Sequence, residues 1–142
     1  MSSNGVFAIS SDEVKIAAIN AWNEIKDYAI SLPAPQKGRA AGFLPTDLCK
    51  AAIDVAAREY PEKASYSRKI IRCRKGGVVY FPGQPKVANT LTIMIPIHIQ
   101  GEVTLNDTRV DMDHHYHILE ESTLNIPEAA KLFTLTIDMI IT

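Results

Sequence analysis

Apolar residues recur every three or four positions in the first third of the chain, which is the period of an amphipathic helix. The stripe runs from Val14 to Leu32. Ser10 and Glu13 have the spacing of a capping box, and Pro33 follows the last apolar position, where a helix normally ends. We therefore predict a first helix between these signals. Three isoleucines fall outside the stripe and suggest contacts on a second side of this helix: Ile16, Ile19 and Ile30.

The helical period returns after a loop of proline, glycine and basic residues at positions 33–45. Thr46 suits the start of a helix, and Pro61 marks its end near Tyr60. One side of this segment carries charges spaced three or four residues apart, namely Asp47, Lys50, Asp54 and Arg58. Because opposite charges at this spacing stabilise an exposed helix face, residues 46–60 are predicted to form a second helix.

Beyond residue 68 the period changes to two, which indicates β-strands. Residues 70–74 and 78–81 flank Lys75-Gly76-Gly77, and this arrangement predicts a hairpin. The clearest strand spans residues 91–99, where every odd position is Leu or Ile. Pro96 lacks an N–H group for a sheet ladder, so this strand is expected at an edge or beside a bulge.

Alternation continues to the end of the chain. Asn106-Asp107 predicts the turn of a further hairpin, and residues 110–118 alternate between an apolar and a polar side. Residues 125–128 resemble a short helical turn with Pro127 at its first position. A last strand is predicted at 132–141, with apolar side chains at the odd positions.

These elements predict an α+β fold: two N-terminal helices packed on one face of a single antiparallel β-sheet of about five or six strands. Residues 1–142 would form one domain, with a flexible N-terminus at 1–10, a helical part at 11–62 and the sheet at 68–142. The other face of the sheet would meet water or a partner, because an antiparallel sheet commonly has one solvated face.

The composition is that of an ordinary globular domain, with 46% apolar and 22% charged residues, which argues against disorder. Cys49 falls in a predicted helix and Cys73 in a predicted strand, so both are expected to be free thiols in a reducing compartment. The N-terminus lacks the pattern of a signal peptide, and the apolar run at 91–99 is too short for a transmembrane helix. We therefore expect a soluble, intracellular protein.

Charge is distributed unevenly although the whole chain has a net charge of −1. Residues 1–36 carry a net charge of −2, residues 37–100 carry +7, and residues 101–142 carry −6. The densest basic segment also has aromatic residues nearby, a combination that suits phosphate contacts and stacking. The residues expected to contact a polyanion are Lys37, Arg39, Arg68, Lys69, Arg72, Arg74 and Lys75. The alternative is that these charges only solvate an edge hairpin.

A second candidate site lies between residues 111 and 117, where carboxylates and imidazoles alternate. Two residues apart on a strand is about 7 Å, which would let a metal ion join neighbouring side chains. His98 could approach from the preceding strand. The candidate metal ligands are His98, Asp111, Asp113, His115 and His117. The alternative is the polar, solvent-facing side of a half-buried sheet, which alternation predicts by itself.

Catalytic and nucleotide-binding signatures such as GxSxG, HExxH and GxGxxG are absent from the sequence. The leading hypothesis is a non-enzymatic protein without a cofactor. It would bind nucleic acid or an anionic membrane surface through residues 37–86 and would associate with copies of itself, as coat, matrix or scaffold proteins do. A small metal-dependent enzyme or metal-binding module is the second possibility, and a protein–protein adaptor is the third.

Overall fold

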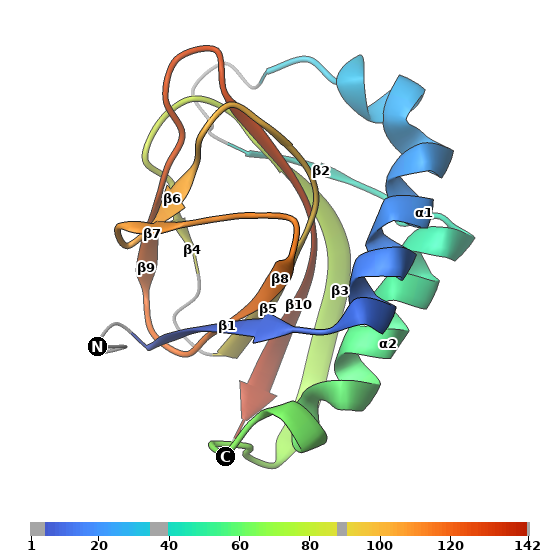
Figure 1. The fold of residues 1–142 in the computed structure, drawn as a ribbon, viewed down its shortest axis with the longest axis vertical. Helices are drawn as coiled ribbons and strands as arrows, with labels where there is room; N and C mark the ends of the chain where they lie inside the picture. The colour runs from blue at the N-terminus through green and yellow to red at the C-terminus, as the bar shows by residue number, and fades with distance from the viewer. Residues whose placement is uncertain (1–4, 35–39, 88–90, 142) are drawn as a thin grey trace.

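The computed structural model describes residues 5–34, 40–87 and 91–141. Within them it contains two helices and ten strands (Figure 1). The helices are α1 (Asp12–Ile30) and α2 (Asp47–Lys63). The strands are β1 (Val6–Ser10), β2 (Ala40–Phe43), β3 (Ile70–Tyr80), β4 (Lys86–Val87), β5 (Leu91–Gln100), β6 (Thr104–Leu105), β7 (Thr108–Arg109), β8 (His114–Ile118), β9 (Ser122–Asn125) and β10 (Lys131–Ile141).

The strands form two antiparallel sheets that face each other. The large sheet has six strands in the order β1-β8-β5-β10-β3-β2, and the small sheet has four in the order β4-β9-β6-β7. From β3 onward the chain passes repeatedly from one sheet to the other. In Figure 1, α1 and α2 lie side by side on the outer face of the large sheet, and the small sheet covers the inner face.

Two apolar cores hold these three layers together. One lies between the helices and the large sheet and includes Ile93 and Ile95 of β5. The other lies between the two sheets and includes Met94 of β5 and Tyr116 of β8. The predicted single sheet with one wet face is therefore wrong. Alternation correctly separates the two faces of a strand, but it does not show whether a mixed face is covered by a second sheet.

The helix boundaries differ slightly from those predicted. Ser11, one residue after the expected cap, is the N-cap of α1, where its side-chain oxygen accepts a hydrogen bond from the Val14 N–H at 3.2 Å. The second helix continues through Pro61 to Lys63. Residues 6–10, which we expected to be flexible, form β1 and pair with β8. No helix among the described residues is both long and apolar enough to span a bilayer.

The hairpin predicted around Lys75-Gly76-Gly77 is also wrong, because β3 runs straight through it and pairs with β10 along most of its length. Gly77 lies inside the strand, and its lack of a side chain leaves room for the ring of Phe43, which packs over it. A Cβ atom at position 77 would lie 2.3 Å from that ring. The turn at Asn106-Asp107 is confirmed, since both residues have positive φ angles (48° and 71°), as this type of hairpin requires.

Candidate functional site: a pocket between the two sheets

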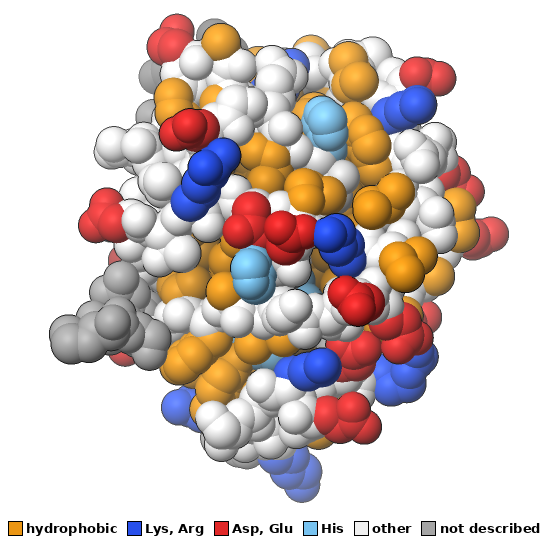
Figure 2. All heavy atoms as spheres, in the orientation of Figure 1, with side chains coloured by type: hydrophobic (Ala, Val, Ile, Leu, Met, Phe, Trp, Pro, Cys, Tyr) orange, Lys and Arg blue, Asp and Glu red, His pale blue; other side chains and the backbone are white. Residues whose placement is uncertain are grey.

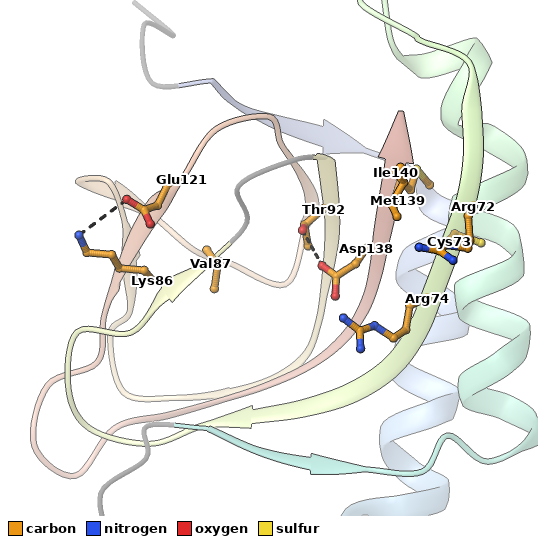
Figure 3. A pocket seen from close by; sticks show the side chains of 10 residues that line it. All are labelled: Arg72, Cys73, Arg74, Lys86, Val87, Thr92, Glu121, Asp138, Met139 and Ile140. Atoms are coloured by element: carbon orange, nitrogen blue, oxygen red, sulfur yellow. Dashed lines mark hydrogen bonds and ion pairs between the residues drawn. The ribbon is translucent and has the colours of Figure 1, made fainter. Parts of the chain in front are cut away.

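A pocket of about 790 Å³ lies between the large and the small sheet (Figure 3). Its large-sheet wall comes from the first part of β3, the last part of β10 and the start of β5. The opposite wall comes from β4 and the segment between β8 and β9. We call it the inter-sheet pocket. Its lining residues are Arg72, Cys73, Arg74, Lys86, Val87, Thr92, Glu121, Asp138, Met139 and Ile140.

A polar row crosses three neighbouring strands on the large-sheet wall. Asp138 of β10 is paired with Arg74 of β3 on one side and with Thr92 of β5 on the other. Residues paired across strands share a face of the sheet. The Thr92 hydroxyl donates a hydrogen bond of 2.7 Å to the Asp138 carboxylate, which holds that carboxylate toward β5.

The two arginines of this wall have no hydrogen-bond or ion-pair partner among the described residues. Arg72 and Arg74 are two positions apart on β3, so both face the inter-sheet space and lie about 7 Å from each other. Figure 3 shows the Arg74 side chain reaching into the space beside Asp138. Two guanidinium groups in this arrangement are available to an anionic group of a ligand.

The opposite wall contributes one further charge of each sign. Lys86 of β4 and Glu121 form an exposed ion pair at 3.7 Å. The lining therefore holds three cationic side chains and two carboxylates. Its net charge of +1 favours a ligand that is negatively charged overall but carries more than one kind of polar group.

The wall continues inward past the polar row. Thr136 follows on β10 and is only 6% exposed, and its partner on β3 is Gly76. A Cβ atom added to Gly76 would meet no heavy atom within 4 Å. Position 76 shares its face with Arg74 because the two are two residues apart. There is therefore room beside the polar row for a larger side chain or for part of a ligand.

Among the described residues, the predicted polyanion surface is divided between the two faces of the large sheet. Arg72 and Arg74 face the inter-sheet space, whereas Lys75 lies on the helix side and pairs with Asp54 of α2 at 3.4 Å. Arg68 and Lys69 precede β3, and Lys37 and Arg39 lie outside the described residues. Strand alternation sends consecutive basic residues to opposite faces, so a dense run in the sequence becomes two separate groups. On the face shown in Figure 2, basic and acidic side chains are interspersed.

The predicted metal ligands are not brought together either. His98 is stacked on Trp22 of α1 with ring centroids 4.2 Å apart. Asp111 and Asp113 lie in the turn before β8, whereas His115 and His117 point from β8 toward the helices. In the described parts of the chain, no three His, Cys, Asp or Glu side chains form a group that could hold a metal ion.

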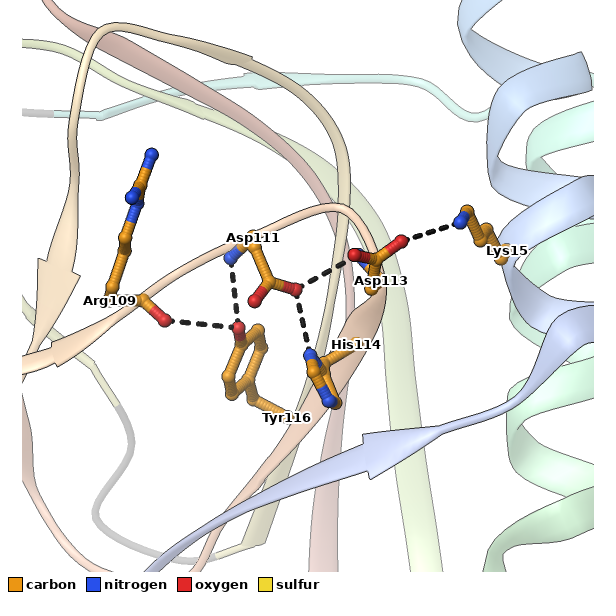
Figure 4. A network of polar contacts seen from close by, with 6 residues as sticks. All are labelled: Lys15, Arg109, Asp111, Asp113, His114 and Tyr116. Atoms are coloured by element: carbon orange, nitrogen blue, oxygen red, sulfur yellow. Dashed lines mark hydrogen bonds and ion pairs between the residues drawn. The ribbon is translucent and has the colours of Figure 1, made fainter.

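The turn before β8 contains a polar network whose role is structural (Figure 4). The Asp111 carboxylate accepts a hydrogen bond from the Asp113 N–H at 2.9 Å and contacts Nδ1 of His114 at 2.7 Å. The Asp111 N–H donates to the Tyr116 hydroxyl at 2.9 Å. An ion pair of 2.5 Å between Lys15 and Asp113 joins this turn to α1. These contacts satisfy the polar atoms of the turn and fix its conformation.

The two histidines of β8 that were expected to face solvent are buried beneath the helical layer. His115 is 2% exposed and His117 is fully buried. Nδ1 of His117 is hydrogen-bonded to the Tyr66 hydroxyl, while Nε2 of each histidine lacks a partner. Burial lowers the pKa of His115 to about 4 and, together with the nearby His115, the pKa of His117 to about 3. Both imidazoles are therefore neutral in the folded protein near pH 7.

Sequence reasoning identified two pocket residues, Arg72 and Arg74, but missed Thr92, Asp138 and the pair on the opposite wall. Asp138 does interrupt an otherwise uncharged strand at residues 132–141. An isolated carboxylate on the polar side of a long apolar strand was the available signal. Its significance depends on the pairing of β10 with β3 and β5, which the sequence does not display.

Comparison with known proteins agrees with this architecture. No family model matches the chain, and no curated protein matches its sequence significantly. Among solved structures, the chain is similar to the crystal structure of a prolyl-4-hydroxylase from Pseudomonas putida, with a TM-score of 0.62 over 99% of this chain and 94% of that one. The sequences are 12% identical, so the likeness shows the fold alone.

The fold is thus of the double-stranded β-helix type, which replaces the predicted α+β arrangement of two helices on one sheet. The hypothesis of a coat, matrix or nucleic-acid-binding protein that binds through residues 37–86 is also wrong, because the chain has this fold and the basic residues of β3 are divided between two faces of the large sheet.

Proposed function

We propose that this chain is a metal-independent binding domain that holds a small, polar organic anion in the inter-sheet pocket. The observation that carries the proposal is the pair of unpartnered guanidinium groups, Arg72 and Arg74, beside the fixed Asp138 carboxylate in a pocket of about 790 Å³. Small-molecule sites typically enclose about 300–1,000 Å³. Most such sites are mainly apolar, whereas half of the residues that line this one are charged, which favours a polar ligand.

The likeness to a prolyl-4-hydroxylase raises the question whether the same fold holds iron here. Non-haem Fe(II) oxygenases bind the metal through two histidines and one carboxylate. The chain has four histidines, and none of them lines the inter-sheet pocket. His98 and His114 are engaged elsewhere, and His115 and His117 lie on the far side of the large sheet. The donor set does not fit an iron site of this kind, so we assign no oxygenase chemistry to the pocket.

The pocket also differs from a surface for a charged polymer. Asp138 faces the same space as the arginines, and Glu121 belongs to the opposite wall, where it pairs with Lys86. Carboxylates repel a continuous phosphate backbone. A compact ligand can place its single anionic group at Arg72 and Arg74 and keep uncharged polar groups near the carboxylates. A discrete small molecule therefore matches the lining better than a polymer does.

Thermal unfolding in the presence of EDTA tests the proposal. Glycerate, glucuronate and glucose 6-phosphate serve as probes, and neutral glycerol serves as the control. At least one anionic probe is expected to raise the unfolding temperature, because a ligand that binds only the native state stabilises it. The Gly76→Leu variant, whose side chain would occupy the open space beside the polar row, is expected to lose this shift. The proposal fails if no anionic probe stabilises the protein, or if stabilisation appears only after a divalent metal is added.

A separate measurement addresses the metal directly. Mn(II) can stand in for Fe(II), and its electron paramagnetic resonance signal weakens when a protein site binds it. The signal is expected to remain that of the free ion when the protein is added. Stoichiometric loss of the signal, abolished by Asp138→Asn, would contradict the metal-independent assignment.

A further inference from the structure

The inter-sheet pocket has two chemically different ends, and the difference restricts the ligand. Arg72 and Arg74 supply only hydrogen-bond donors and are always charged. Carboxylates and phosphates match guanidinium groups in geometry as well as in charge, and they can bridge two of them. The β3 side of the pocket therefore suits one carboxylate or phosphate group.

The polar groups beside the arginines favour a different kind of ligand group. The Asp138 carboxylate is an acceptor when ionised, so it binds hydrogen-bond donors and disfavours a second anionic group. The Thr92 hydroxyl already donates to one oxygen of Asp138 at 2.7 Å. That contact fixes the carboxylate and leaves its other lone pairs for a ligand. Hydroxyl groups are suitable donors because they add no charge to a site whose net charge favours an anion.

We infer that the pocket binds a polyhydroxylated molecule with one anionic group, that is, a sugar phosphate or a sugar acid. The anionic group would lie against Arg72 and Arg74, and the hydroxyl groups would donate to Asp138. This inference rests on the proposed function, since it names the class of ligand for the same pocket. A zwitterion of zero net charge fits less well, because the lining has a net charge of +1.

Isothermal titration calorimetry in EDTA with four probes tests each half of the inference. Glucose 6-phosphate and glucuronate carry both features and differ in the source of the negative charge. Glucose lacks the anionic group, and inorganic phosphate lacks the hydroxyls. Glucose 6-phosphate or glucuronate is expected to bind at least about tenfold more tightly than glucose and inorganic phosphate, since a hydrogen bond to a charged group is worth about 1.5–3 kcal/mol.

Variants test which pocket residues bind the anionic group of the ligand and which bind its hydroxyl groups. Arg72→Gln and Arg74→Gln are each expected to weaken binding of the preferred probe by about tenfold or more, while leaving the weak binding of glucose unchanged. Asp138→Asn is expected to weaken the preferred probe but not inorganic phosphate. Thr92→Val provides a second variant on the same end, because it releases the Asp138 carboxylate without altering its charge. Arg58→Gln is the matched control, because Arg58 pairs with Glu13 on the helical layer at 3.3 Å.

The outcomes separate this inference from the proposed function. If inorganic phosphate binds as tightly as the sugar derivatives, the pocket is an anion site and the polyhydroxylated class is wrong. If glucose alone binds equally well, the anionic requirement is wrong. If none of the anionic probes binds, or if binding is unaffected by Arg72→Gln, Arg74→Gln and Gly76→Leu, the proposed function itself fails.

Discussion

Acidification should destabilise this protein through two buried histidines. His115 and His117 lie beneath the helical layer and are 2% and 0% exposed. Burial lowers the pKa of His115 from 6.5 to about 4, with Glu59 opposing the shift and Lys63 and His114 adding to it. Burial and His115 lower the pKa of His117 from 6.5 to about 3. In the unfolded chain both imidazoles have their ordinary pKa, so they bind protons at a higher pH than in the folded protein.

The direction and size of the effect follow from linkage. Because the folded-state pKa values lie below the unfolded value, stability is fully present above about pH 6.5 and is lost as the pH falls toward the folded values. Each pKa unit corresponds to about 1.36 kcal/mol. At about pH 5 each histidine therefore costs about 2 kcal/mol, and the pair costs about 4 kcal/mol. This loss is a large part of the unfolding free energy of a typical domain, which is about 5–15 kcal/mol.

Urea unfolding followed by circular dichroism at several pH values measures this loss. The wild-type unfolding free energy is expected to fall by about 4 kcal/mol between about pH 7.5 and about pH 5. A double variant, His115→Gln with His117→Gln, should lose most of this dependence, whatever its stability at neutral pH. His114→Gln, which alters the half-exposed neighbour, should retain it. A wild-type free energy that stays constant down to about pH 5, or a double variant with the full dependence, would refute the assignment of these side chains as buried and neutral.

Three further predictions concern single side chains. Gly77→Ala should destabilise the protein by about 1–3 kcal/mol in urea unfolding, because its Cβ would overlap the Phe43 ring. Gly76→Ala should not destabilise it, because the added Cβ meets open space. Equal effects of the two changes would contradict this packing. Ser11→Ala should cost about 1 kcal/mol in the same assay by removing the N-cap of α1, and Ser10→Ala should cost less. Arg72→Gln and Arg74→Gln should each change stability by less than about 0.5 kcal/mol while reducing ligand-induced stabilisation, since neither guanidinium has a partner among the described residues.

The long elements of the fold could be predicted because their patterns are local. The predicted strand at 91–99 is confirmed by β5, and the predicted strand at 132–141 by β10. The helical stripe beginning at Val14 is confirmed by α1. In each case nine or more residues repeat one period, so the pattern exceeds the background of chance alternation.

The small sheet could not be predicted in the same way. β4, β6 and β7 are two residues long, and two residues contain no measurable period. Without this sheet, the inner face of the large sheet looked solvated. The same limit applies to His115 and His117, because alternation placed them on one side of β8 but did not reveal that α2 and Tyr66 cover that side.

The candidate site was predicted only in part for a related reason. Arg72 and Arg74 drew attention because they are consecutive members of a basic run. Their neighbours in the pocket come from β5 and β10, and are brought beside them by pairings between residues far apart in the sequence. Such register is fixed by the packing of whole strands. The run of charge therefore drew attention to two pocket residues, but it did not indicate the size of the pocket or the residues of its other strands.

Amide chemical-shift mapping on EDTA-treated protein tests the central claim most directly. Titration with glycerate, glucuronate and glucose 6-phosphate is expected to shift the amide signals of Arg72, Arg74, Thr92 and Asp138 for at least one probe, with no metal present. The account is contradicted if these signals stay in place until a divalent metal ion is restored, or if the shifts occur only elsewhere on the protein.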